Sequence, residues 1–428
     1  MSKKKRRKVL FRLLLGAVIL ILGVLTQFAV YRYTHNRSAL FKTEGSRLQI
    51  YRDKKWREFT VKGVALEPAA GYSSAAAGTA KDEYVRWFKQ IAAMNANVIR
   101  IQTILSPDFY QALYEYNMLA RWPLYLLQGI WVKDSGNESW LNAYDDRLNN
   151  DFYEEIRRAV DVIHGKGSFK RDNSGPSLNY KLNIAPYVMG FILGKEMDAD
   201  FVIATNEKNT QVKGFDGDYL YTGNASPYEA WLAAAGNYAV SYEQEKYGGP
   251  YRLVSWVNWP STDPLVHRNE SDSKTEELSG VDFEHIYATE KFSAGIFASY
   301  SVFPNLFKYQ SEYLDYRDGS GKPNYYEGYL SELKRHHTMP VLAAEFGIPV
   351  SRGNGGTYTE KEQGEAVVNV FESIINAGFA GGIVYAWDDT KSDQGYGLLA
   401  LEGEGGSSAS HERLKDSYAV IQEKFAEY

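Results

Sequence analysis

The stretch PVLAAEFGI (residues 340–348) is decisive for the fold. Its only charged residue is Glu345, near the carboxyl end of the run. Near-continuous apolar runs of this length are typical of strands in parallel sheets, which are buried on both faces. Such a strand tolerates a charge only at its end. The stretch therefore predicts a buried parallel strand with a carboxylate at its exit.

Seven more apolar runs precede or follow this stretch, and most are separated by helical patterns. The runs are FTVKGVAL (59–66), NVIRIQTIL (97–105), PLYLLQGIWV (123–132), YVMGFILG (187–194), YRLVSWVNW (251–259), SAGIFASYSVF (293–303) and GGIVYAW (381–387). Helical periodicity occurs at 84–91, 152–163, 228–246, 325–336, 361–377 and 410–427. Eight strand–helix repeats predict a (β/α)8 TIM barrel, with a short β-hairpin before it and long insertions after strands 3 to 6. A doubly wound open sheet is the competing fold, but no glycine-rich phosphate loop follows any run.

The composition limits the chemistry. The chain has 428 residues and no cysteine, which excludes disulfides, thiol nucleophiles and Cys-ligated metals. It has 7 histidines and no H-E-x-x-H motif, so we expect no metal and no cofactor. The pair His336–His337 precedes the seventh strand, at the end of the barrel opposite the chemistry, and we expect it on the surface.

The charge is distributed unevenly. Of the 48 Lys and Arg residues, seven lie within residues 1–12, which leaves 41 against 53 acidic residues, or about −12, for the rest. An acidic body argues against nucleic acid as a partner, because nucleic-acid binding requires neutralisation of phosphates. The run KKKRRKV (3–9) resembles a nuclear import signal, but the apolar segment after it favours another explanation.

That segment, LLLGAVILILGVLTQFAV (13–30), carries no charge. About 20 apolar residues span a bilayer as a helix, and the basic flank before it predicts a cytoplasmic N-terminus. No A-x-A-like cleavage site follows, so we expect an uncleaved anchor rather than a cleaved signal peptide. The expected organisation is a cytoplasmic basic tail (1–12), a transmembrane signal anchor (13–31), a linker (32–46) and an extracytoplasmic barrel (47–428) of a single-pass cell-membrane protein.

Two glutamates close apolar runs. Glu196 ends GFILGKE, and Glu345 ends PVLAAE. Opposing carboxylates suit cleavage of a glycosidic bond, because one protonates the leaving oxygen while the other attacks the anomeric carbon. The structural alternative is that both are ion-pair partners at the mouth of the barrel.

The sequence around these residues resembles a large clan. PVLAAEFGIP resembles the seventh-strand signature of retaining (β/α)8 glycoside hydrolases, which include cellulase-like, β-mannanase-like and β-galactosidase-like families. The resemblance implies that Glu196 is the acid/base and Glu345 the nucleophile. It also implies that Arg100 in NVIRI lies beside the nucleophile and that Trp387 in VYAWDD forms the floor of the cleavage subsite. FTVKGVAL looks like the clan's opening strand.

A narrower resemblance covers roughly residues 48–400. YEAWLA, WVNWPSTDPLVH, GIFASYSVFP and EFGIPVSRG resemble a group of membrane-associated bacterial proteins that are predicted to be glycosidases.

The chain departs from the clan at two places. Lys195 stands where the clan has an asparagine before its acid/base; a lysine can donate to a hydroxyl or a carboxylate, so Lys195 is also a candidate substrate-binding residue. Ser301-Val302-Phe303 replaces the usual His-x-Tyr, so the phenol that orients the nucleophile is missing. Tyr300 is a candidate substitute, although adjacent residues of a strand point to opposite faces.

Further substrate-binding candidates follow the fifth and eighth strands. They are Trp256, Asn258, Trp259 and Asp263, together with the rim acid Asp388; a further rim acid, Glu67, follows the first strand. Aromatic faces beside an amide and a carboxylate suit sugar stacking and hydroxyl binding. The structural alternative is a pair of core tryptophans and a turn aspartate.

From these patterns we expect a retaining glycoside hydrolase that acts on a β-linked poly- or oligosaccharide of the cell envelope or extracellular matrix. Two alternatives stay open. One is a transglycosylase that uses the same site. The other, favoured by the changes at Lys195, Ser301 and Phe303, is a catalytically inactive glycan-binding scaffold in an envelope complex with unknown partners.

Overall fold

The structure is a computed structural model. It describes residues 39–66, 79–132, 142–170, 177–267, 278–351, 357–389, 395–402 and 411–428, together with Gly16 and Gly23. Apart from these two glycines, the expected anchor at 13–31 lies outside the described residues. Within the described part of the chain, no helix is long and apolar enough to cross a bilayer.

Eight parallel strands close into a barrel, and each comes from one of the eight apolar runs. They are β4 (Val61–Leu66), β5 (Val98–Ile101), β6 (Tyr125–Ile130), β9 (Val188–Leu193), β11 (Leu253–Asn258), β13 (Ala298–Ser301), β14 (Val341–Phe346) and β15 (Gly381–Val384). Each strand pairs in parallel with the next, and β15 returns to pair with β4. The (β/α)8 prediction is therefore confirmed, and an open sheet is ruled out.

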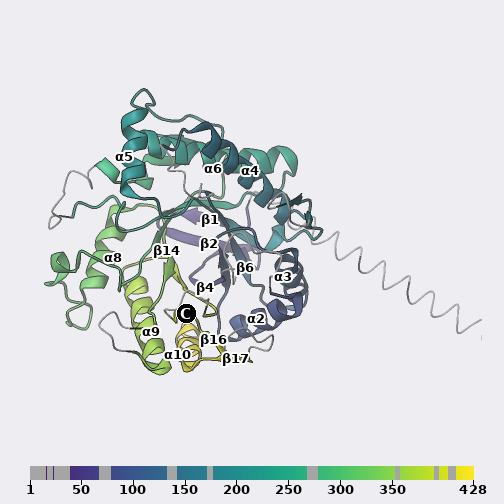
Figure 1. Cartoon of the computed structure of the whole chain (residues 1–428), viewed down its shortest axis with the longest axis vertical. Coiled ribbons are helices and arrows are strands. Elements are labelled where there is room, and N and C mark those ends of the chain that lie inside the picture. Colours follow the sequence, from purple (N-terminus) through teal and green to yellow (C-terminus); the bar gives the residue numbers. More distant parts are fainter. Residues whose placement is uncertain are drawn as a thin grey trace, which may run out of the picture.

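Helices surround the barrel as an outer ring (Figure 1). They are α2 (Lys81–Ala93), α3 (Pro107–Leu119), α4 (Asp146–Ile163), α5 (Ala199–Lys208), α6 (Pro227–Lys246), α8 (Tyr325–His336), α9 (Glu360–Asn376) and α10 (Asp416–Phe425). The six expected helices are present, and α3 and α5 are additions that the apolar periodicity did not single out. The N-cap of α2 is Ala80, which has no side chain to cap the helix.

The buried residues form two clusters on opposite faces of the strands. In β11, Leu253 and Val257 belong to the cluster inside the barrel, whereas Val254 and Trp256 belong to the cluster between strands and helices. This follows from the two-residue period of a strand. The position of a residue within its strand thus decides whether it faces the barrel interior or the helices.

A three-stranded antiparallel sheet closes the N-terminal end of the barrel. It consists of β1 (Phe41–Glu44), β2 (Arg47–Arg52) and β3 (Lys55–Glu58). The expected β2–β3 hairpin is present, with Asp53 and Lys54 at positive φ in its turn. β1 lies within the residues expected to be linker. Phe41 packs edge-on against Phe59 and Tyr125, at centroid distances of 5.1 and 4.8 Å, so the sheet continues the barrel core.

The connections carry further short elements. These are β7 (Ser168–Lys170), β8 (Ser177–Asn179), β10 (Leu220–Thr222), β12 (Ile286–Ala288), β16 (Leu399–Glu402) and β17 (His411–Leu414), with the short 3-10 helices η2 (Ala185–Tyr187), η3 (Phe283–His285) and η4 (Gln310–Tyr313). As expected, long connections follow β6, β9, β11 and β13 at the C-terminal end of the barrel.

The closing sheet should contribute substantially to stability. Phe41→Ala removes a fully buried ring and should lower the free energy of unfolding by about 3–5 kcal/mol. Urea unfolding followed by circular dichroism measures the change. Leu119→Ala, at an exposed position, is the control and should change the value by less than about 0.5 kcal/mol. Equal effects of the two variants would contradict a structural role for the sheet.

Candidate active site

A pocket of about 620 Å³ opens at the C-terminal end of the barrel. It is lined by Gln102, Glu196, Trp259, Pro260, Ser261, Ser301, Phe303, Leu306, Lys308, Tyr309, Glu345, Tyr385 and Tyr396. These residues lie in β13 and β14 or in the connections that follow β5, β9, β11, β13 and β15. Barrels of this class hold their chemistry at this end, because the loops after the strands converge there.

Glu345 lies in β14 and is only 3% exposed. Its Oε1 accepts hydrogen bonds from two side chains of the second barrel strand and its exit. One is the guanidinium of Arg100, which also donates to the carbonyl of Ala344 at 3.1 Å. The other is the amide of Gln102, at 2.6 Å. A buried cation beside the carboxylate favours its ionised form. Arg100 thus lies beside Glu345, the position that the resemblance to the clan implies.

Gln102 was not among the sequence candidates. It lies two residues after Arg100, and residues at this spacing along a strand point to the same face. The same alternation that directs Arg100 toward Glu345 therefore directs Gln102 there. The two-residue spacing from Arg100 was therefore the sequence signal that could have identified Gln102.

Glu196 follows β9 and reaches the same pocket, half-buried. Its carboxylate accepts a hydrogen bond from the hydroxyl of Ser301. Ser301 is in turn the register partner of Glu345 across the β13–β14 pair. One small side chain therefore lies between the two glutamates. Ser301 stands where the clan has the histidine of His-x-Tyr, and its hydroxyl contacts the other carboxylate, Glu196. The position of the clan's phenol is taken by Phe303, which lines the pocket.

Aromatic side chains form the pocket walls. Phe303, Tyr385 and Tyr396 contact one another edge-on, with ring centroids 5.5–5.7 Å apart. Trp259 stands on another wall, where its indole N–H donates to the carbonyl of Met197 at 3.0 Å. Burial raises the pKa of Tyr396, although a hydrogen bond from Asn305 opposes this effect. Rings beside carboxylates present both apolar faces and polar edges to a ligand.

The structure corrects the placement of three aromatic candidates. Trp256 and Tyr300 face the helices, because each belongs to the outward set of its strand. The indole of Trp256 donates to Leu232, and the hydroxyl of Tyr300 contacts His337 at 2.7 Å. Trp387 lies three residues after the end of β15 at Val384, and its side chain is fully buried near Tyr418. Tyr385 lines the pocket instead, because it follows the inward-facing Ile383 by two residues and therefore points to the same side.

The polar candidates behind the pocket serve the scaffold. Asn258 accepts from the backbone of Trp259 and donates to Val281, which fixes the loop after β11. Asp263 is buried and accepts from Tyr329.

Three candidates remain. Asp388 is buried beside Leu399 and is not among the described residues that line the pocket. Lys195 is half-buried next to Glu196 in the chain and is not among the described residues that line the pocket. Glu67 lies outside the described residues.

Comparison with solved structures finds barrels of this kind. The crystal structure of Gas2p from Saccharomyces cerevisiae in complex with laminaritriose and laminaritetraose has a TM-score of 0.50 at 11% identity over 91% of this chain and 68% of that one. A β-galacturonidase of family GH2 from Eisenbergiella tayi, bound to galacturonate, has a TM-score of 0.52 at 12% identity. The alignment covers 91% of this chain and about half, 54%, of the galacturonidase. This similarity shows the fold. No family model and no curated protein matches the chain.

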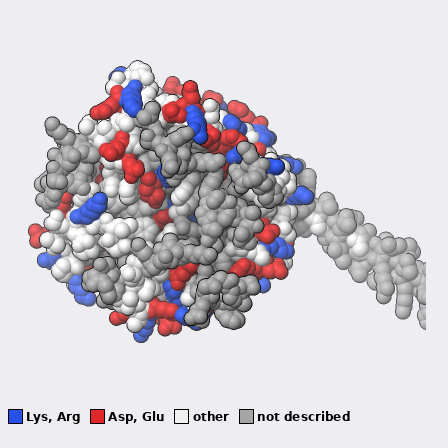
Figure 2. All heavy atoms as spheres, viewed as in Figure 1, with Lys and Arg blue, Asp and Glu red and all other residues white. Residues whose placement is uncertain are grey.

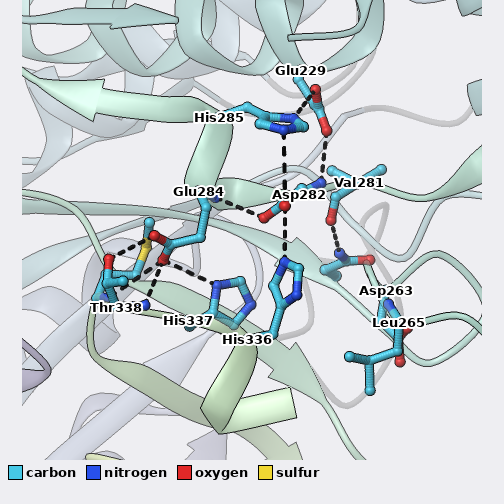
Figure 3. Close-up of polar contacts among 12 residues, drawn as sticks. Glu229, Asp263, Leu265, Val281, Asp282, Glu284, His285, His336, His337 and Thr338 are labelled. Atoms are coloured by element: carbon cyan, nitrogen blue, oxygen red, sulfur yellow. Dashed lines mark hydrogen bonds and ion pairs between the residues drawn. The ribbon is translucent and has the colours of Figure 1, made fainter. Parts of the chain in front are cut away.

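Outside the pocket, a cluster of histidines and acids surrounds the end of α8 (Figure 3). His285 contacts Glu229 at 2.9 Å, and His336 contacts Asp282 at 2.8 Å. The expectation of a surface pair is wrong for His337, which is buried and lies between Tyr300 and the carboxylate of Glu284. His336 is the last residue of α8 and His337 is its C-cap, which lies against Tyr300 of β13.

This cluster should make stability depend on pH. Burial acts to raise the pKa of Glu284, but hydrogen bonds from His337, Thr338 and backbone amides outweigh it and lower the pKa to about 2. Its contribution is thus present above about pH 4.5 and lost as pH falls toward 2. Hydrogen bonds to Glu229 and Asp282 raise the pKa values of His285 and His336. Their contribution is present below about pH 6.5 and lost as pH rises through the raised values.

In Glu284→Gln, the free energy of unfolding should therefore fall less than in the parent protein as the pH is lowered from about 4.5. In the double variant His285→Gln/His336→Gln, it should fall less than in the parent as the pH is raised above about 6.5. The Glu284 effect at neutral pH should be on the order of 1 kcal/mol after solvent screening. Urea unfolding between pH 3 and 8 measures both. The control is Glu290→Gln, at an exposed position. Profiles that match the parent protein would contradict this account of the cluster.

Proposed function

We propose that the chain is a retaining glycoside hydrolase, anchored in the membrane with its barrel outside the cytoplasm, that cleaves β-linked poly- or oligosaccharide of the cell envelope or matrix. The observation that carries the proposal is a pair of carboxylates, Glu196 and Glu345, that share one aromatic pocket at the C-terminal end of a (β/α)8 barrel. A pair of this kind is what a double displacement requires.

Glu345 is the nucleophile in this mechanism. Arg100 and Gln102 both donate to its Oε1, which fixes the carboxylate and stabilises its negative charge before attack. The carboxylate attacks the anomeric carbon, a covalent glycosyl-enzyme forms, and the leaving oxygen departs. Water then attacks the same carbon and releases Glu345.

Glu196 is the general acid and then the general base. It protonates the leaving oxygen in the first step and takes a proton from water in the second. Ser301 suits both states, because a hydroxyl donates to a carboxylate and accepts from a carboxylic acid by rotating. The same contact thus holds Glu196 in place while its protonation changes.

Carbohydrate as the ligand is supported by the pocket walls and by the neighbouring folds. Trp259, Tyr385 and Phe303 line the same pocket as the two carboxylates. Gas2p was solved with laminari-oligosaccharides and the Eisenbergiella enzyme with galacturonate. Export is supported by the uncharged run at 13–30 and the basic residues before it.

The two glutamates should differ in their effects. Glu345→Gln should lower turnover by at least about 10³-fold on every substrate. Glu196→Gln should retain more activity than Glu345→Gln on substrates whose leaving group needs no protonation. Intact-mass spectrometry after incubation with activated fluoro-sugars should find a sugar-sized adduct on the parent protein and none on Glu345→Gln. Glu290→Gln is the matched control and should react like the parent.

An adduct that persists on Glu345→Gln would overturn the assignment of the nucleophile. Glycan binding without any adduct or turnover across the sugar panel would instead establish the inactive scaffold. Product analysis separates hydrolysis from transfer to a second sugar, because only transfer yields products longer than the substrate.

Trp256 in β11 and Trp259 in the loop after it provide a second test. Trp259→Ala should weaken oligosaccharide binding by about 10-fold or more, since it removes a pocket wall. Trp256→Phe should leave binding unchanged and lower stability, because its indole only contacts the core and Leu232. Calorimetric titration of the Glu345→Gln background measures the binding. Equal losses of affinity would contradict the placement of these side chains.

A further inference from the structure

A second groove lies at the opposite end of the barrel. It encloses about 700 Å³ beside the closing sheet, and its lining includes Arg52, Glu58, Lys62, Lys89 and Arg121. Arg52 and Glu58 belong to the sheet, and Lys62 is the second residue of β4. The groove therefore opens at the N-terminal end of the strands, away from Glu196 and Glu345.

The groove is basic in a chain whose net charge is −5. Four cations line it against one acid, and that acid, Glu58, already faces Arg47 at 3.4 Å. Among the described residues, no carboxylate lies within ion-pair distance of Arg52, Lys89 or Arg121. On the face shown in Figure 2, by contrast, acidic and basic side chains are interspersed. An uncompensated basic groove fits a ligand with several negative charges.

Exposed apolar side chains adjoin the cations. Trp122 is 56% exposed and lies between two guanidiniums, with Arg52 at 4.6 Å and Arg121 at 5.5 Å from its ring centre. Leu119, at the end of α3, is 91% exposed, and Met118 beside it is 54% exposed. Tryptophan flanked by arginine, next to aliphatic side chains, is typical of surfaces at a membrane interface.

The path of the chain leads to the same end. Ala39 pairs with Tyr251, which precedes β11, so the described chain begins at the N-terminal end of the barrel. Only residues 32–38 separate it from the expected anchor, and seven residues reach at most about 25 Å. A tether of this length keeps this end of the barrel close to the bilayer.

We propose that this face docks on an anionic phospholipid bilayer. Arg52, Lys89 and Arg121 bind headgroup phosphates, and Trp122 and Leu119 enter the interfacial region. Lys62 is buried at the bottom of the groove, where its ammonium donates to the carbonyl of Phe425 at 2.6 Å. The catalytic pocket then points away from the membrane. The proposal rests on the membrane anchor but not on the glycosidase chemistry, so the absence of turnover leaves it intact.

The lack of cysteine makes a direct test feasible. The full chain is reconstituted in nanodiscs with one introduced cysteine, Leu119→Cys on the docking face or Leu314→Cys at an exposed site after β13. Each is labelled with a fluorophore, and headgroup spin-labelled lipid quenches labels near the membrane. Discs of phosphatidylcholine with and without phosphatidylglycerol are compared.

We expect several-fold stronger quenching at 119 than at 314, and only with phosphatidylglycerol. Each basic side chain near an anionic surface contributes roughly fivefold to binding. Arg52→Gln/Lys89→Gln/Arg121→Gln should therefore weaken docking by roughly 100-fold and abolish the difference. The control triple Lys213→Gln/Lys322→Gln/Lys361→Gln, at exposed sites elsewhere, should preserve it.

Equal quenching at positions 119 and 314 would overturn the proposal. It would also be overturned if quenching at 119 were the same with and without phosphatidylglycerol and were unchanged in the variant Arg52→Gln/Lys89→Gln/Arg121→Gln. A chain that fails to associate with either disc would overturn it as well. Loss of quenching with millimolar inorganic phosphate, in discs of either composition, would identify a small-anion site and also overturn docking.

Discussion

The closure of eight parallel strands is the constraint on which the rest of the structure depends. Closure buries both faces of every strand, so side chains must alternate between the barrel interior and the helices. Only at the C-terminal exits does the inward set reach solvent. Ser301 and Gln102 lie at such exits and belong to the inward sets of β13 and β5, whereas Glu345 reaches the pocket at a register shift of β14, between the inward Ala344 and the outward Phe346. The candidate site is thus a product of barrel geometry rather than of loop conformation alone.

Burial gives the Arg100–Glu345 pair its particular character. Taking both charges out of water costs free energy, which their mutual attraction and the added bonds from Gln102 and to Ala344 offset. Replacement of such a pair by apolar residues is often neutral or stabilising. Its position at the base of the pocket is consistent with the nucleophile role that we propose for Glu345. By contrast, the cluster around His285, His336 and Glu284 lies outside the barrel and serves packing between α8 and its neighbours.

The fold was largely predictable, and the site only in part. Apolar runs located all eight barrel strands, because burial on both faces leaves a strong signal in sequence. The two glutamates were found by the same reasoning, as charges at strand exits. Trp256 was misplaced because its residue type was considered without its position in the strand, and Trp387 because it was matched to the tryptophan that the clan has after its eighth strand. Counting inward positions from Leu253 and Ile383 excludes Trp256 and selects Tyr385. The contact between Ser301 and Glu196 joins β13 to β9, and no local pattern encodes it.

The closing sheet has a mechanical consequence. The chain enters the barrel through Ala39 and β1, whose Phe41 is inserted among the rings at the barrel floor. A pull on the chain at that point is borne first by the β1–β2 ladder and by the bond from the Thr43 amide to Ala294. The strand exits that hold Glu196 and Glu345 lie at the far end, across the full length of the barrel. Tension at the N-terminus would therefore dissipate in the floor before it displaced either carboxylate.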